Sequence, residues 1–194
     1  MNKIVTFDLS EKGIVNAKKE IKNIIKTINK EVNTEFVSMC LDWIQNRAMY
    51  YLNASGGTGQ TIINEIQQSF EKIVKVQTGK LVLNHEKGAY VEFGVGAKGD
   101  QEKHPKATEL GWEYDVDSNA KYPLSRRWTF VLDNGEALNI KYEDITQLTS
   151  NKRVYETQGS SGVLFMYNAI MDFANNLEIP AQLYRSAWAK YIGG

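Results

Sequence analysis

The sequence is poor in the residues that build disulfides, metal sites and proton-transfer sites. Its 194 residues include one cysteine, Cys40, and two histidines, His85 and His104. A single cysteine excludes an intrachain disulfide, and no Cys/His spacing typical of a zinc site occurs. Two histidines and no G-x-S-x-G elbow leave little material for Ser-His-Asp chemistry. We therefore expect no cofactor and no metal, and interpret Cys40 as a small buried hydrophobe in a helical stripe.

Excess charge and long apolar runs are also missing. Lysine plus arginine and aspartate plus glutamate balance at 23 each, which argues against sequence-independent binding of nucleic acid. No run of about 18 apolar residues is present, and the first residues lack the apolar core of a signal peptide, so we expect no contact with a membrane. The hydrophobic content of 42% is ordinary for globular proteins. We expect one domain over residues 1–194, made in a cytoplasm.

The longest pattern is an amphipathic helical arm over about residues 10–53. Apolar residues recur there at steps of three, four or seven: Ile14, Ile21, Ile25, Ile28, Val32, Phe36, Cys40 and Trp43. Lysines from Lys18 to Lys30 cover another face, which we interpret as solvated. Unbroken, the helix would be roughly 60 Å long, against a radius of gyration of about 16 Å for a compact chain of this length. It must either break near Asn33-Thr34 or reach neighbouring subunits.

The rest of the chain predicts an α+β fold, with a small antiparallel sheet and C-terminal helices packed on it. Residues 62–72 suggest a second helix with Ile63, Ile66, Phe70 and Ile73 on one face. Hairpins are expected at residues 73–83 and around Asn134-Gly135, within an inserted β-rich region of about 97–159. Helices are expected over 163–175 and 181–192, the last with Pro180 in its first turn.

Two glycine-containing stretches resemble phosphate-binding loops. Gly94, Gly96 and Gly99 spell G-x-G-x-x-G, but a dinucleotide site needs a helix that opens within this motif. The polar run that follows, Asp100–Pro105, has no helical period, so we predict a turn with positive φ angles instead. The segment Gly59-Gln60-Thr61 lacks the lysine of a P-loop.

One acidic segment offers an alternative function. Trp112, Tyr114 and Val116 alternate with carboxylates, which predicts a strand with one aromatic face and one acidic face in water. With His104 nearby, the acidic face could instead hold a divalent cation and support a metal-dependent hydrolase. The residues of this alternative are Glu113, Asp115, Asp117 and His104.

Three motifs, taken in order, resemble a family of virion proteins. The run Tyr90–Gly96 (YVEFGVG) resembles the YVEFGTG signature of the gene-product-ten-like family of tailed-phage minor structural proteins. His104-Pro105 followed by Gly111–Asp115 (GWEYD) resembles an insertion in members from phages of Gram-positive bacteria, and Phe165–Ala169 (FMYNA) resembles the family's PFMYNA helix start. Val95 replaces a threonine, Val163-Leu164 stands where a proline is common, and residues 119–152 exceed the usual insertion.

The resemblance implies a non-enzymatic structural protein of a siphophage virion, assembled in the bacterial cytoplasm. It implies a homo-oligomeric ring at the head–tail junction, acting as a neck or tail-completion adaptor. The implied partners are a portal-side connector or stopper and a tail terminator or tail-tube protein. An assembly factor absent from the finished particle is a further alternative. Glu92, a carboxylate between apolar neighbours, requires a partner. The candidate structural or interface residues are Tyr90, Glu92, Phe93, Gly94, Gly96, Phe165 and Tyr167.

Overall fold

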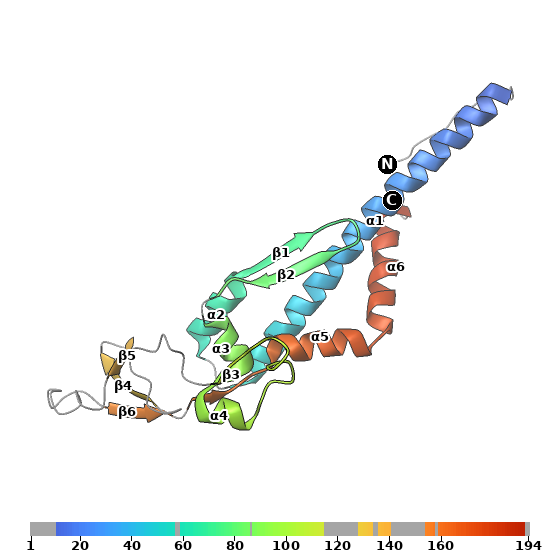
Figure 1. Ribbon diagram of the computed structural model, residues 1–194. Coiled ribbons are helices and arrows are strands. Elements are labelled where there is room, and N and C mark those ends of the chain that lie inside the picture. The colour runs from blue at the N-terminus through green and yellow to red at the C-terminus, as the bar shows by residue number, and fades with distance from the viewer. Residues whose placement is uncertain are drawn as a thin grey trace.

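The computed structural model describes residues 11–56, 59–85, 87–114, 128–133, 136–140, 154–157 and 159–192. Residues 1–10, Arg126-Arg127, the Asn134-Gly135 turn and the carboxylates Asp115 and Asp117 lie outside these ranges. The expected α+β fold is confirmed (Figure 1), because one long helix, short antiparallel sheets and two C-terminal helices make up the chain. No helix within the described ranges is long and apolar enough to cross a membrane.

Helix α1, Glu11–Ala54, is continuous through the predicted weak point. The Thr34 hydroxyl donates to the Lys30 carbonyl at 2.8 Å, so a poor helix former is accommodated within the helix. Of the two outcomes left open by the sequence, the break near Asn33-Thr34 is therefore wrong. The N-terminal half of α1 extends well beyond the other elements (Figure 1).

The first hairpin is confirmed, with a correction at its start. Helix α2 (Gln60–Gln68) ends at Ser69, and β1 (Phe70–Val74) pairs antiparallel with β2 (Gly79–Leu83). The predicted helix over 62–72 was too long, since Phe70 and Ile73 belong to β1. At the last turn of α2 the Ser69 amide donates to the carbonyls of both Glu65 and Ile66, and the Ser69 hydroxyl also donates to the Ile66 carbonyl.

The middle of the chain forms short elements. Helix α3 (Gly88–Phe93) leads into β3 (Gly94–Val95) and helix α4 (Gly96–Gln101). Helix α4 begins within the G-x-G-x-x-G motif, so the expectation that no helix opens there was wrong: a six-residue helix with Ala97 as its single apolar residue has no detectable period. Strand β3 is only two residues long and pairs antiparallel with β7 (Ser160–Ser161), unlike the buried parallel strand of a dinucleotide fold.

After α4, the described residues of the inserted region form several turns and one small sheet. Strands β4 (Trp128–Asp133), β5 (Glu136–Ile140) and β6 (Val154–Thr157) are antiparallel in the order β5-β4-β6, and the pairing of Asp133 with Glu136 confirms the second hairpin. A strand was predicted over residues 109–117, and for the described residues 109–114 this prediction is wrong. Consecutive turns occupy residues 105–111, and Trp112 and Tyr114 are held by separate contacts rather than by a ladder.

The C-terminal helices α5 (Phe165–Asn175) and α6 (Glu178–Ile192) pack chiefly on α1, so their predicted position on a sheet was wrong. They lie on the opposite side of α1 from the β1–β2 hairpin (Figure 1). Pro180 falls in the first turn of α6, as expected. The main core joins three helices through Ala48, Met49, Leu52, Ile63, Ile66, Phe165 and Ala169.

A polar contact fixes α5 against α1. The Arg47 Nε and the Tyr51 hydroxyl both donate to Asp172 Oδ2, at 2.6 and 2.7 Å. The Arg47 guanidinium also lies 4.7 Å from the centre of the Tyr50 ring. The hydrogen bond from Tyr51, and then that from Arg47, lower the pKa of Asp172.

We expect Asp172→Asn to reduce how strongly the free energy of unfolding falls as the pH is lowered. A lowered folded-state pKa stabilises the protein above the unfolded value, about 3.9, and this contribution is lost as the pH falls through the folded value. The variant should therefore be less stable than wild type at pH 7 and should differ less from it near pH 3. Urea midpoints at both pH values measure this, and an equal difference at both would contradict the prediction.

Candidate functional site

The seven candidate residues named from the sequence lie in one junction between α3, β3, α4 and α5. Tyr90, Glu92 and Phe93 belong to α3, while Gly94 and Gly96 begin β3 and α4. Phe165 and Tyr167 belong to the first turn of α5 and are separated from α3 by about 70 residues of sequence. The structure brings these segments together through Glu92.

The ends of α3 and α5 cap each other. The Glu92 carboxylate accepts the Met166 N–H at Oε2 and the Tyr167 N–H at Oε1, both at 2.8 Å. In return, the Val91 and Glu92 carbonyls at the end of α3 accept the N–H groups that precede α5, from Val163 at 2.8 Å and from Leu164 at 3.1 Å. We call this set of four hydrogen bonds the reciprocal cap. It satisfies helix-end groups that have no partner within their own helices.

The carboxylate is buried, and its environment favours its charge. Glu92 is 6% exposed and lies at the N-terminus of α5, where the helix dipole stabilises an anion. No side-chain cap comes from Leu164, the N-cap residue itself. Leu164 has a φ of 54°, the only positive value at a non-glycine residue in the described part of the chain. Such a conformation costs roughly 1–3 kcal/mol, so the contacts of the reciprocal cap must hold it.

His104 supplies a third donor to Glu92. Its Nε2 lies 3.1 Å from Glu92 Oε1, and its Nδ1 accepts the Lys106 N–H at 3.0 Å. Because Nδ1 acts as an acceptor, the hydrogen-bond network assigns the proton to Nε2 of a neutral ring that donates to the carboxylate. His104 is 4% exposed, and its own amide donates to the Tyr114 hydroxyl at 2.6 Å.

Aromatic rings enclose this polar pair. The Phe93 ring lies between those of His104 and Trp112, with centroid distances of 4.2 and 5.0 Å. Tyr90 meets Trp112 edge-on at 5.5 Å, and Tyr167 meets His104 in the same way at 5.2 Å. The Trp112 indole N–H donates to the Gly94 carbonyl at 3.2 Å. The rings exclude water, which strengthens the hydrogen bonds inside.

The glycines of the G-x-G-x-x-G motif allow the backbone to pass close to neighbouring chain. Gly94 has a φ of 80°, and a Cβ there would lie 2.5 Å from the Gly162 nitrogen. Gly96 also has a positive φ, 70°, so the predicted positive-φ turn is confirmed at both residues. A Cβ on Gly99 would lie 2.8 Å from Tyr114 Cδ1. These glycines therefore let the backbone segments of the junction approach each other closely.

The arrangement is suited to holding segments together. Both oxygens of Glu92 and both ring nitrogens of His104 are engaged, so proton transfer to a substrate would require the junction to open. The geometry of the described residues gives no support to the alternative of a metal-dependent hydrolase. Its His104 is directed to Glu92, its Glu113 is exposed, and no group of three or more potential metal ligands occurs among the described residues.

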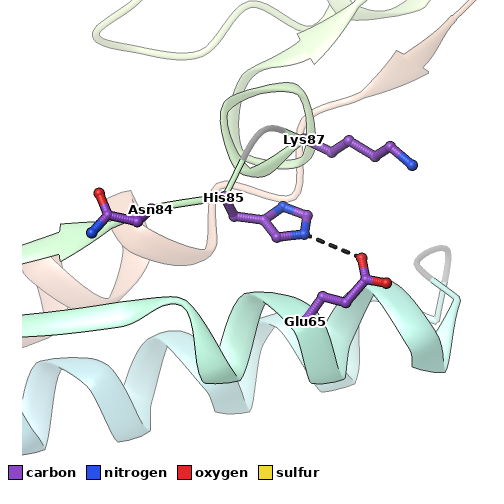
Figure 2. A pocket seen from close by; sticks show the side chains of 4 residues that line it. All are labelled: Glu65, Asn84, His85 and Lys87. Carbon is purple, nitrogen blue, oxygen red and sulfur yellow. Dashed lines mark hydrogen bonds and ion pairs between the residues drawn. The ribbon is translucent and has the colours of Figure 1, made fainter.

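A separate polar hollow lies between α2 and the segment after β2 (Figure 2), with a volume of about 290 Å³. Glu65, Asn84, His85 and Lys87 line it. His85 Nε2 lies 3.3 Å from Glu65 Oε2, while its buried Nδ1 has no hydrogen-bond partner among the described residues. Sequence reasoning did not point to this pair, because its members are 20 residues apart and belong to no motif.

Comparison with protein-family models, with curated proteins and with solved structures finds no match for this chain. The resemblance therefore rests on the sequence motifs themselves.

We expect Glu92→Gln to lower the free energy of unfolding by about 2–3 kcal/mol, because the amide cannot accept all three donors and leaves a buried group unpaired. The matched control is Glu113→Gln, an exposed glutamate in the neighbouring segment, which should change stability by less than about 0.5 kcal/mol. Urea unfolding measures both. Equal stability of the two variants would show that the buried carboxylate contributes nothing to the junction.

Proposed function

We propose that this protein is a structural component of the head–tail junction of a tailed phage, a member of the gene-product-ten-like family that assembles as a ring. One observation carries the proposal above the others. Two motifs of the resemblance, YVEFG in α3 and β3 and FMYN in α5, meet in the reciprocal cap, where Glu92 accepts the N–H groups of Met166 and Tyr167. Their pairing through Glu92 gives a physical reason for both to occur in one protein.

The third motif belongs to the same unit. His104 donates to Glu92, and Trp112 and Tyr114 of the GWEYD run contact Gly94 and His104. A family pattern that combines these motifs therefore specifies a single buried junction. Such a pattern is what a structural protein needs, because its motif residues preserve geometry rather than present a reactive group.

The shape of the molecule also supports an assembling subunit. Helix α1 extends beyond the rest of the chain (Figure 1), where it can contact a neighbouring protein. In the proposed role, one face of the ring binds the portal-side connector or stopper, and the other binds the tail terminator or tail tube. Exposed apolar side chains and complementary charge would provide the specificity.

We expect mass spectrometry of purified virions to detect this protein in a fixed number of copies per particle. Deletion of its gene should leave filled heads and finished tails that are not joined. The control is a protein encoded by the same phage but absent from virions, which shows that the particles are free of lysate. Absence from purified virions, despite abundance in the lysate, would contradict the proposal and favour the assembly factor.

A further inference from the structure

The N-terminal half of α1 continues the face that α5 and α6 cover in its C-terminal half. At 3.6 residues per turn, Ile14, Ile21 and Ile25 fall within the same sector of about 60° as the seam residues Val32, Phe36 and Trp43. Those three are covered within the chain: Val32 is fully buried, Phe36 meets Tyr184 at 5.2 Å, and Trp43 meets Phe173 at 5.6 Å.

Much of the same face is open in the N-terminal half of α1, although Ala17, beside it, is only 6% exposed. Ile21 is 44% and Ile25 is 53% exposed, and Ile14 is also exposed. From here on, the arm means only residues 11–30 of α1, the N-terminal part of the predicted helical arm, and its stripe is Ile14, Ile21 and Ile25. Several exposed isoleucines in register with a buried seam form a contiguous surface, which distinguishes them from scattered exposed side chains.

Charge determines which partner suits the arm. The arm contains six lysines and two glutamates, a net charge of 6 − 2 = +4, whereas the whole chain has 23 − 23 = 0. The remainder of the chain therefore has a net charge of −4. Two arms laid side by side would bring lysine rows together, so arm-to-arm pairing is disfavoured. The part of a second copy outside its arm has the opposite net charge and is therefore the partner that charge favours.

Helices α5 and α6 meet at a turn on the opposite side of α1 from the β1–β2 hairpin (Figure 1), and a second set of exposed apolar side chains belongs to this region. We call it the corner; it consists of Ile170, Met171 and Leu177, all exposed, with Leu177 at 80%. The chain has no lysine or arginine between residues 154 and 184, and Glu178 flanks the corner. Asp172 also lies nearby, but its charge is paired with Arg47. The C-terminal end of α5 adds the negative pole of a helix dipole.

We propose that the arm of one copy docks through its stripe onto the corner of a second copy. The two patches differ, so the contact is heterologous, and repetition of a heterologous contact produces a ring or an open filament. The proposal deepens the ring assembly of the proposed function and rests on it for closure. A basic amphipathic helix can also bind anionic lipid. Here, however, a second copy of the chain supplies an apolar patch next to negative charge.

Cysteine pairing between copies tests the contact. In a Cys40→Ser background, one protein carries Ile25→Cys and the other, distinguished by an affinity tag, carries Leu177→Cys. Mild oxidation of the mixture should give a mixed covalent dimer. Val15→Cys is the matched control, since Val15 is 64% exposed on the same arm but lies about a quarter turn from the stripe. It should give at least fivefold less mixed dimer.

Equal yields from Ile25→Cys and Val15→Cys, or covalent dimers only between two Ile25→Cys chains, would overturn the proposal. Light scattering supplies an independent readout. Wild type should exceed the monomer mass at low salt, and the triple change of Lys18, Lys22 and Lys26 to glutamate should return it to the monomer mass without a shift in Tm.

A wild-type protein that stays monomeric at all concentrations, or that instead binds vesicles containing phosphatidylserine, would also overturn the arm–corner contact. Neither result would remove the protein from virions, so failure here and failure of the proposed function are separable.

Discussion

The Glu92 carboxylate is the group on which the junction depends. A buried charge without partners costs several kcal/mol, and here three N–H donors and a helix N-terminus offset that cost. The donors come from His104 and from Met166 and Tyr167 in the first turn of α5, so the charge is stabilised only when these two segments meet α3. The same contacts hold Leu164 at a positive φ.

The reciprocal cap transmits this constraint to the rest of the molecule. Phe165 is the first residue of α5 and lies in the main core with Leu52 and Ile66, so fixing the start of α5 also fixes α3 against α1. Farther along α5, the hydrogen bond between Arg47 of α1 and Asp172 fixes the direction of α5 relative to α1. The arm and the corner are thereby held on one rigid framework. A subunit that must present two surfaces in a defined relation to its neighbours requires this kind of framework more than it requires a reactive group.

Sequence patterns predicted the elements that are long or have distinctive turns. The period of α1, both hairpins and Pro180 in the first turn of α6 each have a local signal, and the structure confirms them. Helix α4 was missed because six residues with Ala97 as the single apolar side chain carry no period. The need of Glu92 for a partner was predictable from its apolar neighbours, but the partners were not. His104 is 12 residues away and Met166 is 74 residues away, and only the folded chain decides which donors meet the carboxylate.

Native-state hydrogen exchange tests the reciprocal cap most directly. The amides of Met166 and Tyr167 occupy the first turn of α5, where a helix supplies no acceptor of its own. Thr61 and Ile62 occupy the same positions in α2, whose N-cap residue, Gly59, provides no side-chain cap. We expect the two α5 amides to exchange as slowly as the core amides of α1, and Thr61 and Ile62 to exchange rapidly. Rapid exchange at Met166 and Tyr167 while α1 remains protected would contradict the central role of Glu92.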